Sequence, residues 1–273
     1  MPLLTIDDTK CKKDKLCVIE CPMAIIEMKD KDTCPAPAKG REALCLNCGH
    51  CVAVCPTGAL SLNTMKSDEC EAIADNWNPG YEIIDKYLKT RRSIRKFKKD
   101  PVEKDKLLKI VNMATNAPTA HNGRPVEWTV ISERENVKMI AESVLDWMKD
   151  MLEKKPDEAR MFHFDIILKA WDNGIDTITW GAPALIIAHG MKANPMAFTG
   201  CTIALSHADI AAPSLGLGCC WAGFITWCSM SWKPLKEKIN LPKEHALFGS
   251  LLTGYPLFKY NRVPKRKTVV HWM

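Results

Sequence analysis

Two cysteine runs near the N-terminus constrain the fold of this chain more than any other feature. Residues 45–56 read C-x2-C-x2-C-x3-C-P, which is the spacing that holds iron–sulfur clusters. Residues 11–22 have the same spacing, with Asp14 in the place of the second cysteine. Short tails of similar pattern follow both runs, at 23–26 and 57–60. The N-terminal region is therefore an internal repeat, and we expect each copy to hold one cluster.

The last cysteine of each run leads away from the loop that carries the other three ligands. In two-cluster proteins of this pattern, it binds the cluster of the opposite run. The expected ligands of cluster I are Cys11, Asp14, Cys17 and Cys55. The expected ligands of cluster II are Cys45, Cys48, Cys51 and Cys21. Zinc is the alternative metal, but zinc sites take their C-x2-C ligands as two separate pairs, whereas here four ligand positions follow one another in a single run.

Asp14 leaves two interpretations of cluster I open. In the first, its carboxylate ligates the fourth iron of a 4Fe-4S cubane. In the second, it is a surface residue beside a 3Fe-4S cluster. A carboxylate is a harder ligand than a thiolate and holds cluster iron less firmly. We favour the cubane, with one labile iron.

The chain contains thirteen cysteines, and acidic residues and lysines interrupt any apolar stretch at its start. We therefore expect no export signal, a cytoplasmic protein, and metal ligation instead of a disulfide framework. The cysteines outside the two runs are expected to pack as small buried side chains: Cys34, Cys70, Cys201, Cys219, Cys220 and Cys228.

The length of 273 residues predicts two domains. We expect a two-cluster domain at 1–64, a polar linker at 65–80 and a second domain at 81–273. The net charge is +6, and the basic residues gather at 91–99 and 259–267. Two short basic runs suit a small anionic ligand better than nucleic acid. Residues 210–232 lack charge, but proline and three glycines interrupt them, so we expect no membrane span.

The second domain alternates helical and strand patterns, which predicts an α+β fold. Helices are expected at 81–90, from an N-cap at Asp100 toward Pro118, at 135–152 and at 199–215. Strands are expected at 126–132, 183–188 and 247–255, with a helix end, a glycine-rich turn and a buried strand in 210–232. Neither G-x-G-x-x-G after a strand nor G-x-x-x-x-G-K occurs, so the sequence does not support a Rossmann or P-loop site.

Four segments of the second domain resemble motifs of the nitroreductase family of flavoproteins, and they occur in the family's order. Residues 91–97 resemble its opening motif, and 117–125 resemble its P-S-x-x-N-x-Q-P segment. Residues 215–224 are similar to its flavin-ring loop, and 254–267 to its phosphate-clamping end. The cysteine repeats resemble bacterial-type two-[4Fe-4S] ferredoxins. The whole chain thus resembles a ferredoxin–nitroreductase fusion.

This resemblance implies an FMN-binding α+β sandwich that forms a homodimer, with FMN in the subunit interface. The residues that it assigns to FMN are Arg91, Arg92, Ser93, Arg95, Pro118, Thr119, Asn122, Arg124, Trp221, Ala222, Gly223, Lys265 and Lys267. The cations would hold the phosphate, Asn122 the pyrimidine edge, and the Gly223 N–H would approach flavin N5. Arg124 stands where many relatives have glutamine. It either stabilises the reduced flavin or faces a substrate carboxylate.

The implied function is that of an iron–sulfur flavoprotein oxidoreductase in which clusters and FMN exchange electrons to reduce a small organic acceptor. No catalytic side chain is assigned, because water or flavin N5 can supply the proton. Two alternatives stay open: another flavin reaction such as reductive dehalogenation, and an electron relay or redox sensor without a substrate. The external electron donor is expected to be ferredoxin or NAD(P)H.

Overall fold

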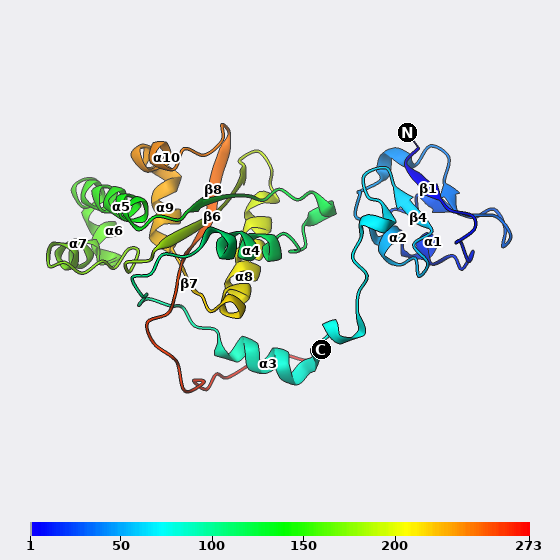
Figure 1. Ribbon diagram of the computed structural model, residues 1–273. Helices are drawn as coiled ribbons and strands as arrows, with labels where there is room; N and C mark the ends of the chain where they lie inside the picture. The colour runs from blue at the N-terminus through cyan, green and yellow to red at the C-terminus, as the bar shows by residue number, and fades with distance from the viewer. Residues whose placement is uncertain (1) are drawn as a thin grey trace. The chain divides into compact units, whose positions relative to one another are not determined.

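The computed structural model describes residues 2–273, and the chain divides into two compact units. The first contains the residues up to Pro79 together with the short segment Ala120–Gly123. The second contains Gly80–Thr119 and Arg124–Met273. Figure 1 shows the chain from the blue N-terminal unit to the red C-terminal tail.

The first unit is built from very short elements around a small apolar core. Strand β1 (Leu4–Ile6) pairs antiparallel with β4 (Leu60–Leu62), and β2 (Ile26–Glu27) pairs with β3 (Ala36–Pro37). Each cysteine run contributes one helix, α1 (Leu16–Glu20) and α2 (His50–Ala53). Because the strands are so short, the backbone ladders alone give this unit little cohesion.

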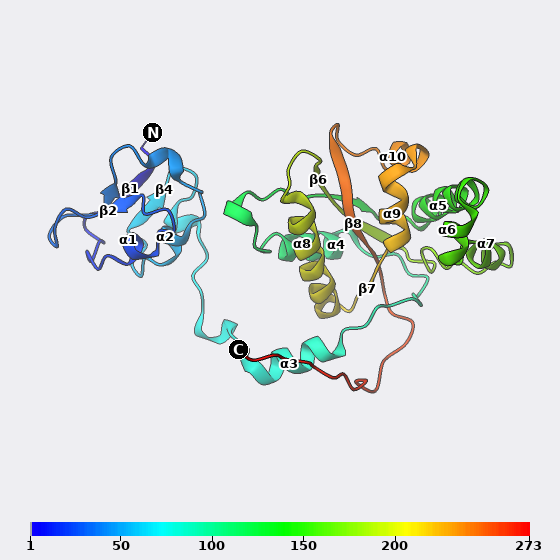
Figure 2. The same ribbon diagram turned by 180° about the vertical axis from the view of Figure 1, so that it is seen from behind.

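The second unit is centred on an antiparallel sheet with helices on both faces. The order of the sheet is β5 (Glu127–Ile131), β6 (Ala184–Met191), β8 (His245–Gly254) and β7 (Gly218–Trp221). Helices α4 (Lys104–Ala114) and α8 (Ala197–Ala211) cover one face (Figure 2). Helices α5 (Arg134–Lys154), α9 (Gly223–Ser231) and α10 (Lys233–Ile239) cover the other. The remaining helices are α3 (Gly80–Thr90), α6 (Pro156–Met161) and α7 (Phe164–Asp172).

Strand β6 shows how the sequence produces these layers. Successive strand residues point to opposite faces of a sheet. Ala184, Ile186 and Ala188 pack against the layer of α4 and α8. Leu185 and Ile187 pack against the layer of α5 and α9. A strand buried on both faces needs a continuous apolar run, and β6 provides one.

One sequence expectation is wrong in detail. Helix α4 begins at Lys104 and not after an N-cap at Asp100, because Val102 is buried in the core just before the extended Glu103. The region 210–232 has the expected order of a helix end, a turn at Gly216 and the buried strand β7, and helix α9 then follows. Its uncharged sequence follows from burial against the sheet. Among residues 2–273, no helix combines the length and the apolar character needed to cross a membrane.

Candidate functional site

The two cysteine loops share an unusual backbone. Lys13 and Lys15 in the first loop adopt left-handed conformations, with φ of 55° and 67°. The equivalent residues of the second loop, Asn47 and Gly49, have φ of 51° and 75°. A left-handed backbone costs free energy at residues other than glycine. Its recurrence at matched positions therefore indicates that both loops require the same conformation. The repeat seen in the sequence is therefore also a repeat of loop shape.

The structure brings the eight expected cluster ligands together in two separate groups. One small cavity is lined by the four residues expected for cluster I: Cys11, Asp14, Cys17 and Cys55. A second is lined by the four expected for cluster II: Cys21, Cys45, Cys48 and Cys51. In both groups, the last cysteine of one run joins the first three positions of the other.

Backbone N–H groups point at several of these sulfurs. Ala59 donates to Cys55 Sγ at 3.2 Å, and Asn47 donates to Cys45 Sγ at 3.4 Å. Such hydrogen bonds stabilise thiolates and tune the potential of a cluster. Asp14 differs from the cysteines, because its Oδ1 accepts the Leu16 N–H at 3.1 Å and its side chain is exposed.

The chemistry of the grouped thiols fits a cationic cluster. Burial, together with the neighbouring Cys21 and Cys48, raises the pKa of Cys51 to about 11. Burial also raises the pKa of Cys17, and so do the nearby Cys55 and Cys11. Several neighbouring thiols are hard to ionise at the same time without a counter-charge. A metal that supplies positive charge converts them readily to thiolates.

One cysteine outside the motifs lies at the edge of the first group. Hydrogen bonding with Asp8 and with the neighbouring Cys11 raises the pKa of the Cys34 thiol to about 11. Cys34 is only half-buried and Cys70 is exposed, so the expected buried packing is found for neither. It is confirmed for the four buried cysteines of the second unit, Cys201, Cys219, Cys220 and Cys228.

In the second unit, the structure groups part of the expected FMN site around strand β7. The Arg91 guanidinium lies 3.1 Å from a carboxylate oxygen of Asp209 on helix α8. Burial raises the pKa of the Asp209 carboxyl, and the nearby Arg91 and Trp221 oppose that rise. Burial also raises the pKa of the Cys220 thiol, and the nearby Arg95 opposes that rise. The backbone of the Arg91–Arg95 segment is held against β7 by the Ile94 N–H, which donates to the Cys219 carbonyl at 2.9 Å.

Asp209 was missed by sequence reasoning. Its side chain is buried on helix α8, and burial raises the pKa of its carboxyl while Arg91 lowers it. Two cations and a carboxylate thus share one region of β7 and α8. The only signal in the sequence is a lone carboxylate in an otherwise apolar, alanine-rich helix.

The backbone after the end of β7 is open at Gly223. A Cβ added at Gly223 would have no atom within 4 Å among residues 2–273. A Cβ added at Gly218, at the start of β7, would instead meet Ile94 Cγ1 at 2.3 Å. Gly218 is thus needed for packing, whereas Gly223 faces open space. Trp221 is exposed, and Ala222 is the buried N-cap residue of α9.

The segment that resembles the P-S-x-x-N motif is split by the structure. Thr119 Oγ1 accepts the Arg124 N–H at 3.1 Å, and both residues line a cavity of about 380 Å³ beside α4. Asn122 belongs to the first unit, where its amide donates to the carbonyls of Leu46 and Asn47. Asn122 is thus assigned to a different unit from Arg91 and Arg95.

The remaining expected FMN residues have varied surroundings. Pro118 is exposed and Ser93 is half-buried. Arg92 donates to the carbonyls of Lys89 and Arg91, and also to the carbonyl of Arg262 at 3.3 Å. Lys265 and Lys267 are exposed in the extended C-terminal tail. The hydrogen bond to Arg262 is what ties that tail to the Arg91–Arg95 segment.

Two family models match different parts of the chain. Residues 88–255 match the model of the nitroreductase family, and residues 9–59 match that of the 4Fe-4S dicluster domain. The FMN reductase (NAD(P)H) of Bacillus subtilis is 27% identical over 191 residues, covering 67% of this chain and 70% of the relative. The iodotyrosine deiodinase of Thermotoga neapolitana is 22% identical, covering 67% of this chain and 94% of the relative.

Solved structures show the same fold. A nitroreductase with bound FMN from Bacteroides fragilis superposes with a TM-score of 0.54 at 19% identity, covering 70% of this chain and all of the other. A BluB-like flavoprotein from Clostridium difficile gives a TM-score of 0.55 at 21% identity, covering 69% and 96%. The chain therefore belongs to the nitroreductase family of FMN-dependent oxidoreductases, and it carries a two-cluster 4Fe-4S domain ahead of the flavin domain.

Proposed function

We propose that this protein passes electrons between its two clusters and FMN in order to reduce a small organic acceptor. The observation that carries the proposal is the union, in one chain, of a dicluster domain at 9–59 and a nitroreductase domain at 88–255. Clusters transfer single electrons, and FMN converts between one-electron and two-electron chemistry. The protein supplies binding, orientation and electrostatics around these groups.

In this proposal, the FMN phosphate lies beside Arg91 and Arg95. Arginine forks match phosphate oxygens, and a phosphomonoester carries nearly two negative charges at neutral pH. Arg91 forms an ion pair with the buried Asp209, so its guanidinium is held in place before the phosphate arrives. The other residues that resemble the family's FMN site keep the roles proposed from the sequence.

The flavin ring is proposed to lie against the open space at Gly223. The absent side chain leaves the backbone N–H at the start of α9 accessible. The N-terminus of a helix favours negative charge through its free N–H groups and its dipole. A ring nitrogen that gains electron density is therefore stabilised there without any ionisable side chain.

We also propose a homodimer. All residues of α3 are exposed or half-exposed in the single chain, and four large apolar side chains lie on its surface: Tyr81, Ile83, Ile84 and Leu88. The C-terminal tail exposes further apolar side chains, among them Phe258 and Trp272. A second copy is the partner that we propose for these surfaces, because exposed apolar groups of this extent mark interaction sites.

Seven of the thirteen cysteines are expected cluster ligands, and no disulfide bond joins any of the thirteen, which suits a reducing compartment. We propose that this compartment is the cytoplasm.

The test of the proposed function is a donor–acceptor screen on anaerobically prepared protein. Iron, sulfide and FMN are first quantified. Reduced ferredoxin, dithionite and NAD(P)H are then supplied with nitroaromatic, halogenated aromatic and free-flavin acceptors. We expect turnover with at least one acceptor and faster FMN reduction from reduced ferredoxin than from NAD(P)H. FMN reduction without turnover of any acceptor would favour a relay or sensor.

A matched pair of variants tests the route of the electrons. Cys48→Ala removes one expected ligand of cluster II, whereas Cys70→Ala removes an exposed cysteine outside the expected ligand sets. Reduction of FMN by ferredoxin should be lost in the first variant and kept in the second. If Cys48→Ala reduces FMN at the wild-type rate, electrons do not pass through cluster II.

A further inference from the structure

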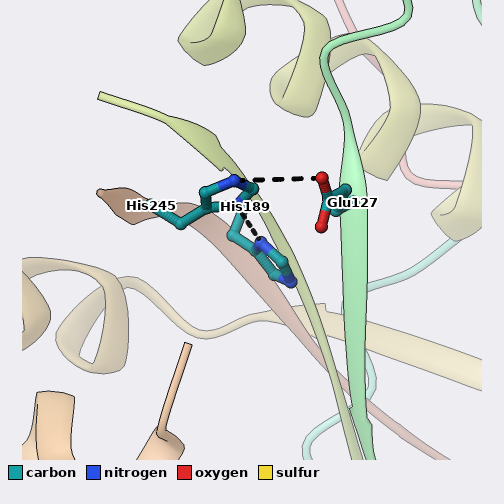
Figure 3. A group of neighbouring side chains, drawn as sticks. All are labelled: Glu127, His189 and His245. Carbon is teal, nitrogen blue, oxygen red and sulfur yellow. Dashed lines mark hydrogen bonds and ion pairs between the residues drawn. The ribbon is translucent and has the colours of Figure 1, made fainter. Parts of the chain in front are cut away.

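A second donor group lies in the flavin domain, separate from the cysteine loops. Glu127, His189 and His245 come from three different strands, β5, β6 and β8, and their side chains converge (Figure 3). One oxygen of the carboxylate and one nitrogen of each histidine lie within 4.8 Å of one another. None of these residues belongs to the sequence motifs that resemble the FMN site.

The register of the sheet explains why these three residues meet. Glu127 lies directly opposite His189 in the β5–β6 ladder. In the β6–β8 ladder, His189 lies opposite Leu247 and Met191 opposite His245. His189 and His245 are thus diagonal neighbours, which lie close enough for long side chains to touch.

A β-bulge is needed to place His245 on this face. Ala188 pairs with Gly249 but His189 pairs with Leu247, so Phe248 is an extra residue in β8. A shift of one residue moves every following side chain to the opposite face of a strand. Without the bulge, His245 would point to the other face of the sheet. Bulges of this kind commonly re-aim a side chain near a functional site.

The distances within the group are short. His189 Nδ1 lies 2.9 Å from His245 Nδ1, and His245 Nε2 lies 3.8 Å from Glu127 Oε1. Two ligands of a tetrahedral zinc ion, each about 2.0–2.1 Å from the metal, are about 3.3 Å apart. These two distances end on opposite ring nitrogens of His245, and one ion takes only one of them. With one donor atom counted per residue, the three donors lie within 4.8 Å of one another, and rotation of the exposed Glu127 side chain brings them to one ion.

Thr129 orients the buried histidine. Its Oγ1 lies 3.1 Å from His189 Nε2. When Nε2–H donates to this hydroxyl, the lone pair of Nδ1 faces His245. Ligating histidines in metal sites normally donate their second ring N–H to such an outer partner. His189 is buried, which already restricts its ring, and the contact with Thr129 fixes the orientation of that ring.

We propose that Glu127, His189 and His245 form a binding site for a divalent transition-metal ion of the zinc class. Two imidazoles and one carboxylate are a donor set that zinc accepts, with a fourth position left for water. The Glu127 side chain is 60% exposed, which gives the ion an entry path and leaves room for that water. The ion joins β5, β6 and β8 and is independent of the iron–sulfur clusters.

The probe for this site is zinc added anaerobically to protein that already holds its clusters and FMN. After gel filtration, zinc is counted by mass spectrometry and its ligands are read by zinc K-edge X-ray absorption. We expect one zinc per chain with a shell of nitrogen and oxygen at about 2.0–2.1 Å. A sulfur shell near about 2.3 Å would place the zinc on cysteines and overturn the proposal.

Variants assign the ligands. His245→Asn should lose the zinc, and Glu127→Gln, at an exposed position that leaves the core intact, should bind it more weakly. Thr129→Val should lower the affinity about tenfold or more through loss of the outer hydrogen bond. His163→Asn is the control, because His163 is exposed and has a φ of 60° that asparagine tolerates. Unchanged zinc content in both His245→Asn and Glu127→Gln, or no zinc in the wild type, would exclude the site.

Discussion

The side chains of Arg91 and Asp209 form an ion pair, with 3.1 Å between Nη1 and Oδ2. Arg91 comes from the segment before the flavin domain's core, and Asp209 comes from the buried face of helix α8. The pair therefore fixes one cation of the proposed phosphate site to the interior of the fold. The guanidinium still has donors for a ligand, because 29% of the side chain is exposed.

Replacing Arg91 and Arg95 together by alanine should weaken FMN binding and leave the clusters intact. Each charge-assisted contact contributes about 1.5–3 kcal/mol, so we expect a loss of about a hundredfold or more in affinity. Quenching of flavin fluorescence measures the dissociation constant. The control is Lys98→Ala with Lys99→Ala, two exposed cations nearby. An equal dissociation constant in the arginine variant would place the phosphate elsewhere.

Asp209→Asn should lower the melting temperature of the FMN-free protein, because the partly buried Arg91 loses its partner. Removing one member of a buried pair costs about 3–5 kcal/mol, and the partial exposure of Arg91 reduces this to about 1–2 kcal/mol. FMN should then raise the melting temperature more in the variant than in the wild type, since the phosphate replaces the lost charge. Asp85→Asn, which breaks a surface pair with Lys89, should change neither value.

Gly223→Ala and Gly218→Ala should have opposite effects. The added methyl group at Gly223 enters open space, so FMN-free protein should keep its melting temperature while FMN binds more weakly. The methyl group at Gly218 meets Ile94 Cγ1 at 2.3 Å, so the fold itself should lose stability. Thermal melts with and without FMN separate the two outcomes. Tight FMN binding by Gly223→Ala would move the flavin ring away from α9.

The buried cysteines should resist alkylation. Burial raises the pKa of Cys201, Cys219 and Cys228 to about 12. At pH 8, roughly one such thiol in ten thousand is the reactive thiolate, and this fraction rises about tenfold for each unit of pH. Iodoacetamide followed by peptide mass spectrometry should therefore label the exposed Cys70 first. Comparable labelling of Cys219 and Cys70 at pH 8 would show that β7 opens readily.

Asp14 should control the iron content of cluster I. Mild oxidation of the wild type should release one iron and produce a three-iron signal in electron paramagnetic resonance. Asp14→Cys should suppress this conversion, because thiolate is the better ligand, and Asp14→Asn should favour the three-iron form from the start. If all three proteins resist oxidation with the same spectra, Asp14 is not a ligand.

The cluster loops were predictable from the sequence, and the four flavin motifs were recognised by resemblance, because both depend on residues close together in the chain. The ligand exchange known for two-cluster proteins of this spacing paired the last cysteine of each run with the opposite loop. Asp209 was not predictable in the same way, because its partner Arg91 is 118 positions away and helix α8 carries no motif. The group of Glu127, His189 and His245 depends on strand order and on a single bulge. Alternating polarity predicts strands, but it does not predict which strands pair or where the register shifts.

The start of α4 illustrates a different limit. Asp100 and Pro101 are good residues for the beginning of a helix, and local preference alone favours an early start. Tertiary packing prevails because Val102 is buried and the next residue, Glu103, has an extended backbone. Helix ends are decided by small energies, and one buried side chain outweighs them.

The matched left-handed residues of the two cysteine loops bear on how the N-terminal unit assembles. At one of these positions the second loop has Gly49, whereas the first has Lys15, which pays about 1–2 kcal/mol for the same backbone. The first loop therefore depends more heavily on its iron to keep its shape. When iron is scarce, nascent chains should mature asymmetrically, with the second loop preformed and the first completed only as its cluster is delivered.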